Sequence, residues 1–176
     1  PALVLFIDGR GCGRHGIPDR GVARAVRGHG IATLLIDLLT PEEQQEKPHP
    51  GLHGVDLPRL TQRVLDVTAW LARDPHLGRA PLGLCGLGGG APAALIAAGR
   101  LGVTVRSLVC IGGRADQAGP AALASVRAPT LLMAPRHWCW RVPAGLSASR
   151  AVCSAVHLQL PPSNCLCCSS LPAQMA

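Results

Sequence analysis

The chain has 176 residues, of which 48% are hydrophobic, and it carries a formal net charge of +7 at pH 7. That length suits a single domain with a sizeable core, and no apolar run reaches the roughly 18 residues of a membrane helix, so we expect a soluble, cytoplasmic protein with no membrane partner. The charge comes almost wholly from scattered arginines and aromatic residues make up only 2% of the chain, which argues against a nucleic-acid partner because little is available to stack on bases.

Two buried strands flank a helix at the start of the chain. Residues 2–7 are continuously apolar, which predicts a strand buried on both faces, as in the interior of a parallel sheet. A glycine-rich loop and a helix over residues 19–30 follow, because Asp19 can cap its start and Gly30 can end it. Residues 31–36 predict the second buried strand. The chain opens directly before a strand and without a methionine, so we expect it to be part of something longer.

A polar segment separates these strands from the helix with the clearest pattern. Residues 40–56 are rich in proline, acidic and amide side chains, which predicts a long surface loop of the kind that serves as a lid or a binding segment. In residues 57–73, apolar side chains recur at intervals of four, three and four, which places them on one face of a helix. These side chains are Leu60, Val64, Val67 and Leu71.

Strands and helices alternate through the rest of the predicted domain. Strands are predicted over residues 81–85, 105–111 and 129–133, with helices over residues 91–101 and 116–126 between them. This alternation predicts an α/β fold with a mostly parallel sheet and helices on both faces, a three-layer sandwich that is incomplete at both ends. The pattern stops near residue 135. We predict one α/β domain over residues 1–135 and a divergent or poorly ordered tail over residues 136–176, which could reflect a changed reading frame.

A glycine-rich turn follows the strand predicted at residues 81–85. The segment Gly86-Leu87-Gly88-Gly89-Gly90 places glycines two before and two after Gly88, and a helix of small residues comes next. This is the frame of a hydrolase nucleophile turn, whose strained backbone and closely packed helix exclude larger side chains. Gly88 at its centre has no hydroxyl, thiol or carboxylate, so no covalent step can pass through this residue.

Several segments, taken in order, resemble the dienelactone hydrolase-like branch of the α/β-hydrolase family. They are residues 3–9 with the following Arg14-His15, residues 32–43, residues 86–94, residues 112–116 and residues 126–132. The resemblance implies hydrolysis of a small carboxylic ester or lactone by a nucleophile, a histidine and an acid, with backbone N–H groups holding the oxyanion. We expect no cofactor.

The residues at the implied site match this scheme only in part. Gly88 takes the nucleophile position and leaves it vacant. His157 is the candidate base, because it stands near the place of the family's late histidine. Gly89, with either Gly9 or Arg10, would supply the backbone N–H groups that hold the oxyanion.

Two further departures weaken the expectation of activity. Asp8 stands where the family often has a histidine, and an ionised carboxylate there would repel a developing oxyanion. The acid expected after residues 129–133 is absent, since the sequence continues Ala134-Pro135-Arg136-His137. We therefore predict a degenerate member of the family without triad-type hydrolysis.

A dinucleotide-binding domain is the alternative. Residues 86–91 also satisfy the GxGxxA pattern between a strand and a helix, but the acid expected about 20 residues further on is missing from residues 103–111. Placing the pattern at residues 9–14 supplies the acid, as Asp37, but puts Arg14 where a small residue belongs.

Cysteines and histidines do not predict a metal site. Three cysteines lie singly among apolar or glycine neighbours, as small buried hydrophobes do: Cys12, Cys85 and Cys110. The cluster Cys165-Leu166-Cys167-Cys168 has no partner at zinc-finger spacing. His49 and His53 are four residues apart, but the prolines around them exclude the helix that would bring them together.

Overall fold

Six parallel strands form one sheet. The structure, a computed structural model, describes residues 2–9, 17–45, 56–133 and 151–154. The strand order is β2-β1-β3-β4-β5-β6, and every neighbouring pair is parallel. The strands are β1 (Leu3–Asp8), β2 (Ala32–Asp37), β3 (Leu82–Leu87), β4 (Val105–Ile111), β5 (Thr130–Met133) and β6 (Ala151–Ser154).

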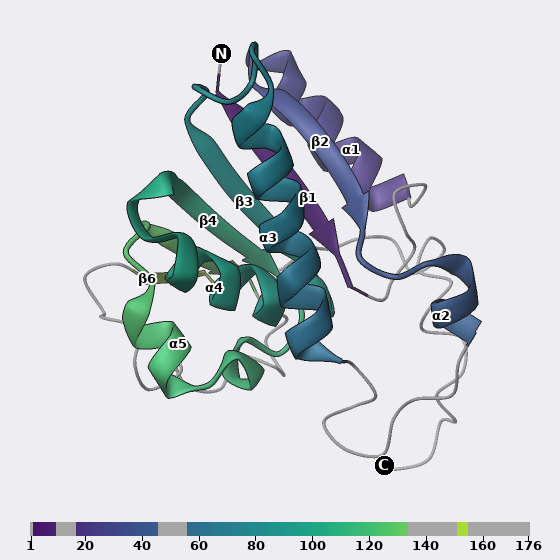
Figure 1. The fold of residues 1–176 in the computed structure, drawn as a ribbon, viewed down its shortest axis with the longest axis vertical. Coiled ribbons are helices and arrows are strands. Elements are labelled where there is room, and N and C mark those ends of the chain that lie inside the picture. The colour runs from purple at the N-terminus through teal and green to yellow at the C-terminus, as the bar shows by residue number, and fades with distance from the viewer. Residues whose placement is uncertain (1, 10–16, 46–55, 134–150, 155–176) are drawn as a thin grey trace.

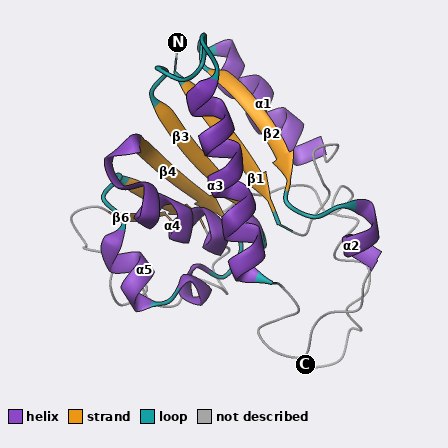
Figure 2. Ribbon diagram, in the orientation of Figure 1, coloured by secondary structure: helices purple, strands orange, loops and turns teal. Residues whose placement is uncertain are grey.

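Helices cover both faces of this sheet (Figure 1, Figure 2). On one face lie α3, α4 and α5, and on the other lies α1. The described helices are α1 (Ile17–Gly28), α2 (Pro41–Gln45), α3 (Leu57–Arg73), α4 (Gly90–Leu101) and α5 (Pro120–Ser125), with short 3-10 turns η2 (Gly102–Thr104) and η3 (Ala115–Ala118). The three-layer α/β fold predicted from the sequence is confirmed.

Side chains of β1 alternate between two hydrophobic clusters. Leu5 and Ile7 are fully buried toward α3 and α4, while Phe6 packs with Ala23 of α1 on the opposite face. A strand buried on both faces must be apolar throughout, which explains the uninterrupted run that the sequence shows. Cys85 also lies in the α1-side cluster, as expected of a small hydrophobe.

Small side chains let α4 lie close to the sheet. Five alanines of this helix are buried: Ala91, Ala93, Ala94, Ala97 and Ala98. A Cβ built on Gly86 of β3 would lie 2.7 Å from the Cα of Ala91, so strand and helix are in direct backbone contact. This proximity requires a residue without a side chain at Gly86.

Two elements have the predicted bounds, and others differ. α3 and β4 begin and end as predicted, but the buried face of α3 includes Thr61 and Thr68, whereas Val67 is only partly buried. The strand predicted at residues 81–85 continues to Leu87, because Gly86 and Leu87 remain paired with β4. The glycine frame of the turn therefore begins inside the strand.

The helix predicted at residues 116–126 is divided in two. Gly119, with φ of 79°, separates η3 from α5, and Pro120 begins α5. Positive φ interrupts a right-handed helix, and glycine adopts it readily. The predicted long loop at residues 40–56 also contains α2 at its start, while residues 46–55 lie outside the described residues.

The tail prediction stays open. β6 falls within residues 136–176 and pairs with β5, and the rest of that range lies outside the described residues. None of the described helices is long and apolar enough to cross a bilayer.

Candidate functional site

The candidate site lies at the carboxyl ends of β1 and β3. These neighbouring strands end level, since Asp8 is in register with Leu87. From β1 the chain moves outward to β2, whereas β3 lies on the other side of β1. A parallel sheet leaves a crevice at such a reversal of direction, and ligands of open α/β sheets bind there.

Gly88 occupies the turn between β3 and α4. Its φ is 49°, a left-handed conformation that glycine adopts without the strain a side chain brings. The Gly88 N–H donates to the carbonyl of Ile111 at 3.0 Å, and the Gly88 carbonyl accepts from the N–H of Ala91 at 3.2 Å. The strand, the sharp turn and the helix give the context in which a nucleophile turn is recognised. That Gly88 stands at the nucleophile position of the family stays a prediction.

The loop after β1 rests directly on the turn. A Cβ built on Gly9 would lie 2.3 Å from the carbonyl carbon of Gly89, and one on Gly90 would lie 2.2 Å from the Ile7 carbonyl oxygen. Real Cβ atoms do not approach backbone so closely, so glycine is needed at both positions. The structure thus brings Gly9, Gly88 and Gly89 together at one edge of the sheet. Arg10 and His157, also predicted at the site, lie outside the described residues.

Gly113 approaches the turn from β4 and was not predicted as a site residue. A Cβ built on it would lie 1.9 Å from the Gly88 carbonyl oxygen. Its φ of 73° is also left-handed. In the sequence, the Gly112-Gly113 pair was visible as one segment of the family resemblance, but only the fold shows which backbone it touches.

No model of a protein family matches the sequence. A putative phosphoribosyl transferase of Mycobacterium tuberculosis, present in two strains, is 47% identical over 131 residues, which make up 74% of this chain and 28% of that protein. The crystal structure of a dienelactone hydrolase from Anabaena variabilis is 39% identical, covers 77% of this chain and 62% of its own, and has a TM-score of 0.69. This chain belongs to the dienelactone hydrolase-like branch of the α/β-hydrolases.

A more distant structure agrees on the fold. Est1E from Butyrivibrio proteoclasticus is 12% identical, with a TM-score of 0.62 over 77% of this chain and 68% of its own. The chain spans under a third of the length of the curated relatives it matches, and 62% of the dienelactone hydrolase chain. These similarities support the branch. The activity of this chain is a separate matter, which depends on the residues at the site.

Neither Cys85 nor Cys110 is placed to act as a nucleophile. Cys85 is 4% exposed and packs on the α1 side of the sheet. Cys110 is also buried, and burial raises the pKa of its thiol far above the usual range, with a smaller contribution from Cys85. A nucleophilic cysteine needs a lowered pKa and access to substrate, and Cys110 has neither.

Two carboxyl groups follow one another at the ends of neighbouring strands beside the turn. Asp8, at the end of β1, is 6% exposed and is in register with Asp37 at the end of β2. The two carboxyl groups are thus placed beside the crevice where an oxyanion would form. Among the described residues no group of three or more histidine, cysteine or acidic side chains is arranged to hold a metal ion.

A second polar cluster joins α2 to α3, and the sequence analysis did not predict it. Glu43 accepts two hydrogen bonds from Arg63, at 2.6 and 2.7 Å, and also pairs with Arg59. Thr40 and Glu43 exchange backbone-to-side-chain hydrogen bonds, the capping box that begins α2. Two hydrogen bonds lower the pKa of Glu43 from 4.5 to about 2. The hydrogen bond from Arg63 has the larger effect, and the one from the Thr40 N–H has the smaller. The sequence signal for this helix start is Thr40, with Pro41 at the first helical position and Glu43 three residues after Thr40.

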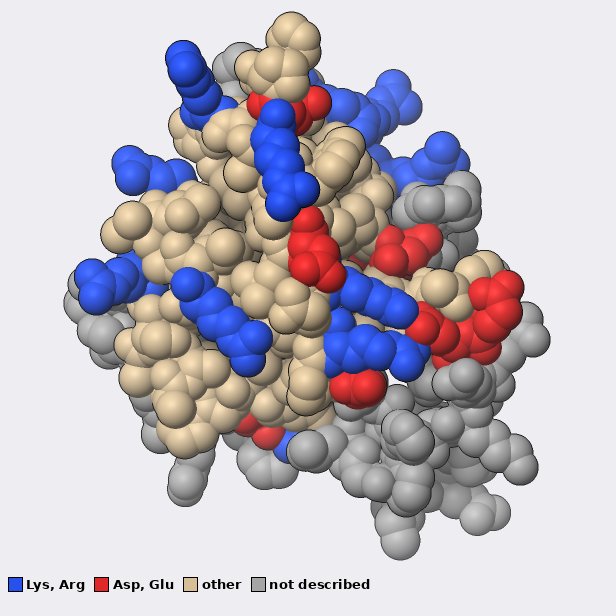
Figure 3. Space-filling view, in the orientation of Figure 1, with Lys and Arg blue, Asp and Glu red and all other residues tan. Residues whose placement is uncertain are grey.

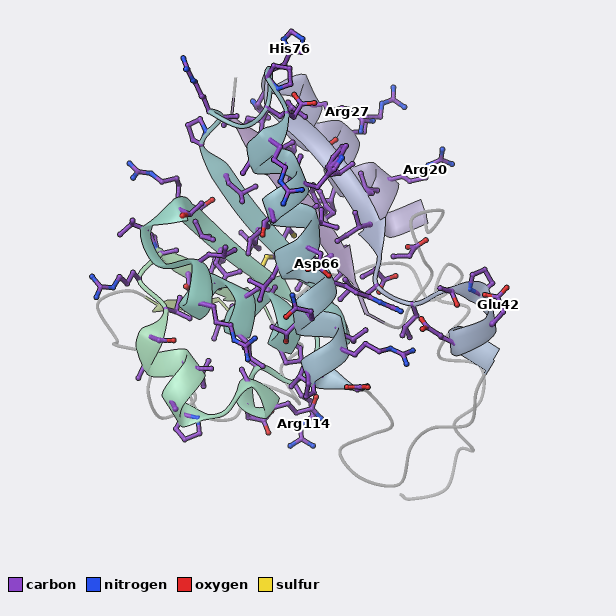
Figure 4. All side chains as sticks on the ribbon, viewed as in Figure 1. Arg20, Arg27, Glu42, Asp66, His76 and Arg114 are labelled. Atoms are coloured by element: carbon purple, nitrogen blue, oxygen red, sulfur yellow. The ribbon has the colours of Figure 1, made fainter. Side chains whose placement is uncertain are left out.

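The charged groups of this cluster lie over α2 and α3, where blue and red side chains meet in Figure 3 and where Glu42 and Asp66 are labelled in Figure 4.

A shallow groove of about 340 Å³ is lined by residues of β2, by the residue after β2 and by residues of α3. Its lining residues are Leu35, Ile36, Asp37, Leu38, Arg63, Asp66 and Val67. None of them is a glycine of the turn, but the groove reaches the end of β2 through Asp37, and the N–H of Leu38 donates to the Asp8 carbonyl at 2.9 Å.

Proposed function

We propose that this chain is a degenerate dienelactone hydrolase-like protein that binds the carbonyl group of a small ester or lactone without cleaving it by triad chemistry. The observation that carries the proposal is Gly88, which stands with φ of 49° at the centre of the turn between β3 and α4. Nucleophilic hydrolysis needs a side chain at that point, and glycine offers none. A cytoplasmic location and the absence of nucleic-acid and membrane partners remain part of this proposal.

Retained carbonyl binding is supported by the backbone around the turn. The first N–H groups of α4 have no acceptor within the helix, and the positive end of the helix dipole favours a developing negative charge. Gly89 is the residue before this helix, and the loop containing Gly9 packs against it. Backbone donors need no side chain, so the loss of the nucleophile leaves them in place.

Loss of hydrolysis is supported by two further residues. Asp8 lies at the end of β1 beside the crevice. If it is ionised, its charge opposes the oxyanion of a tetrahedral intermediate. The acid that would orient His157 is missing from the sequence after β5. In a serine protease, loss of that acid lowers kcat by about 10⁴-fold.

Hydrolysis of p-nitrophenyl acetate tests the proposal. The purified chain is compared with Gly88→Ser and with Gly88→Ala, which brings the same strain at positive φ but no hydroxyl. We expect the parent and Gly88→Ala to match the background rate. Turnover by Gly88→Ser alone, abolished by His157→Ala, would show that the carbonyl pocket and a base remain.

One result would contradict this proposal. Turnover by the parent that disappears in His157→Ala would mean that hydrolysis proceeds without a side chain at residue 88. A Gly88→Ser variant that folds, as judged by circular dichroism, but stays inactive would show that the base or the orientation of the pocket is also lost.

Dinucleotide binding is the second candidate, and one observation favours it. β1, a glycine-containing loop, α1 and β2 follow one another, and β2 ends in Asp37, the position of a ribose-binding acid. Against it, Asp8 lies at the end of β1, beside the crevice that a pyrophosphate would have to occupy. A carboxyl group at that place disfavours a polyanion when it is ionised.

We propose that phosphoribosyl transfer, the activity named for the Mycobacterium relative, does not reside in the matched region. That region covers 28% of the relative. The same chain matches a dienelactone hydrolase at 39% identity over 77% of its length. The region shared with the relative is therefore better explained as a hydrolase-like unit.

A further inference from the structure

The peptide bond between Gly88 and Gly89 has two functional ends. Its carbonyl belongs to Gly88, and its N–H, on Gly89, is the proposed donor to a bound carbonyl oxygen. A trans peptide unit is planar, so its C=O and N–H point in opposite directions. Whatever fixes the direction of the Gly88 carbonyl therefore fixes the direction of the Gly89 N–H.

The Gly88 carbonyl is held from two sides. The N–H of Ala91 donates to its oxygen at 3.2 Å. On another side lies Gly113, close enough that a built Cβ would be 1.9 Å from the Gly88 oxygen and 2.8 Å from its carbon. Since the Gly113 Cα already lies against this carbonyl, the peptide has no room to rotate toward β4.

The loop that carries Gly113 is itself anchored. The N–H of the preceding Gly112 donates to the carbonyl of Met133 in β5 at 2.7 Å, and the Gly88 N–H donates to Ile111 in β4. These hydrogen bonds join the loop and the turn to adjacent strands of one sheet. A side chain at residue 113 would therefore have to displace the Gly88 carbonyl rather than its own backbone.

We propose that Gly113 is a positioning residue, which keeps the Gly88–Gly89 peptide oriented so that the Gly89 N–H faces the carbonyl-binding pocket. The inference rests on the proposed function for the identity of the ligand. Gly113 acts only through the turn and does not touch the ligand. This role gives a reason for glycine at residue 113, which lies outside the nucleophile frame of residues 86–90.

Positive φ alone would also call for glycine at residue 113, and the neighbouring residue separates the two explanations. Gly112 has φ of 66° and Gly113 has φ of 73°. A Cβ built on Gly112 meets nothing within 4 Å, whereas one on Gly113 meets the Gly88 carbonyl. Alanine at either position brings similar backbone strain, because both residues have positive φ. Only Gly113→Ala presses on the turn.

The test uses the full chain labelled with ¹⁵N-glycine and two-dimensional NMR. γ-Butyrolactone, a neutral lactone with one carbonyl oxygen to accept a hydrogen bond, is titrated into the parent, Gly112→Ala and Gly113→Ala. We expect the Gly89 amide signal to shift on binding in the parent and in Gly112→Ala. In Gly113→Ala we expect affinity to fall at least tenfold. Equal affinity in the two variants would overturn the proposal.

Spectra without ligand separate this inference from the proposed function. The Gly89 amide signal should move in Gly113→Ala and keep its position in Gly112→Ala, whether or not γ-butyrolactone binds the parent. Absence of binding in the parent would refute carbonyl binding alone. A Gly89 signal that is the same in both variants would refute the positioning role.

A relaxation measurement covers the case in which Gly113→Ala does not fold. If Gly113 fixes the peptide, the Gly89 N–H of the parent has an order parameter of about 0.85, as in rigid backbone. A value below about 0.6 would show a freely moving peptide and would overturn the proposal.

Discussion

At the scale of single residues, the site is built from glycines that serve different purposes. The sequence alone predicts Gly88 as a vacant nucleophile position, because the flanking glycines define the frame. The contact of Gly113 with the Gly88 carbonyl was not predictable, because it joins two separate loops through the order of the strands. Spacing along the chain identifies local turns, and it does not identify such long-range contacts.

Alanine substitution should separate glycines that are needed from those that are not. Gly90 and Gly21 both lie in helices, but a Cβ at Gly90 would be 2.2 Å from the Ile7 carbonyl oxygen, whereas one at Gly21 meets nothing within 4 Å. We expect Gly90→Ala to lower the free energy of unfolding by about 1 to 3 kcal/mol through overpacking. Gly21→Ala should raise it by about 0.5 to 1 kcal/mol through helix propensity. Urea denaturation of both variants measures these changes, and equal effects would contradict the contact.

At the scale of elements, long periodic segments were predictable and short capped ones were not. α3 was predicted with its observed bounds, because its apolar side chains recur over several turns. α2 has only five residues and no apolar stripe, so its existence depends on the capping box and on Glu43 binding the arginines of α3. The buried Thr61 and Thr68 likewise look polar in the sequence, although their methyl groups suit a buried helix face.

The link between α2 and α3 should depend on pH. The pKa of Glu43 is lowered to about 2 from 4.5, so the unfolded chain binds the proton more tightly than the folded one. The stabilisation is therefore complete above pH 4.5 and is lost as the pH falls toward 2. We expect Glu43→Gln to lower stability at pH 7 and to flatten the loss of stability in this acidic range, as followed by urea denaturation at several pH values.

Glu42→Gln is the matched control for that measurement. It removes one negative charge from the same turn but leaves both arginine contacts of Glu43 intact. Its acid profile should stay closer to that of the parent. If both variants show the same profile, the Glu43 cluster does not link the two helices.

At the scale of the whole molecule, the fold was predictable and the activity was not. Alternating strands and helices determined a three-layer α/β architecture, since parallel strands need helical crossovers. Catalysis depends on where distant residues converge, and the candidate base His157 lies outside the described residues. The glycine pattern at the carboxyl ends of β1 and β3 fits both a hydrolase turn and a dinucleotide-binding loop. The two are therefore distinguished by which class of ligand binds.

Thermal unfolding with each class of ligand makes that distinction for the intact chain. A ligand that binds only the folded state stabilises it by about 2.7 kcal/mol at 100 times its Kd. We expect γ-butyrolactone to raise the melting temperature, because the backbone donors near Gly89 suit a neutral carbonyl oxygen. We expect NAD to leave it unchanged, because its pyrophosphate would meet the carboxyl group of Asp8 at the end of β1. A rise with NAD that is lost in Asp37→Ala would instead establish the dinucleotide alternative, since Asp37 would then hold the ribose.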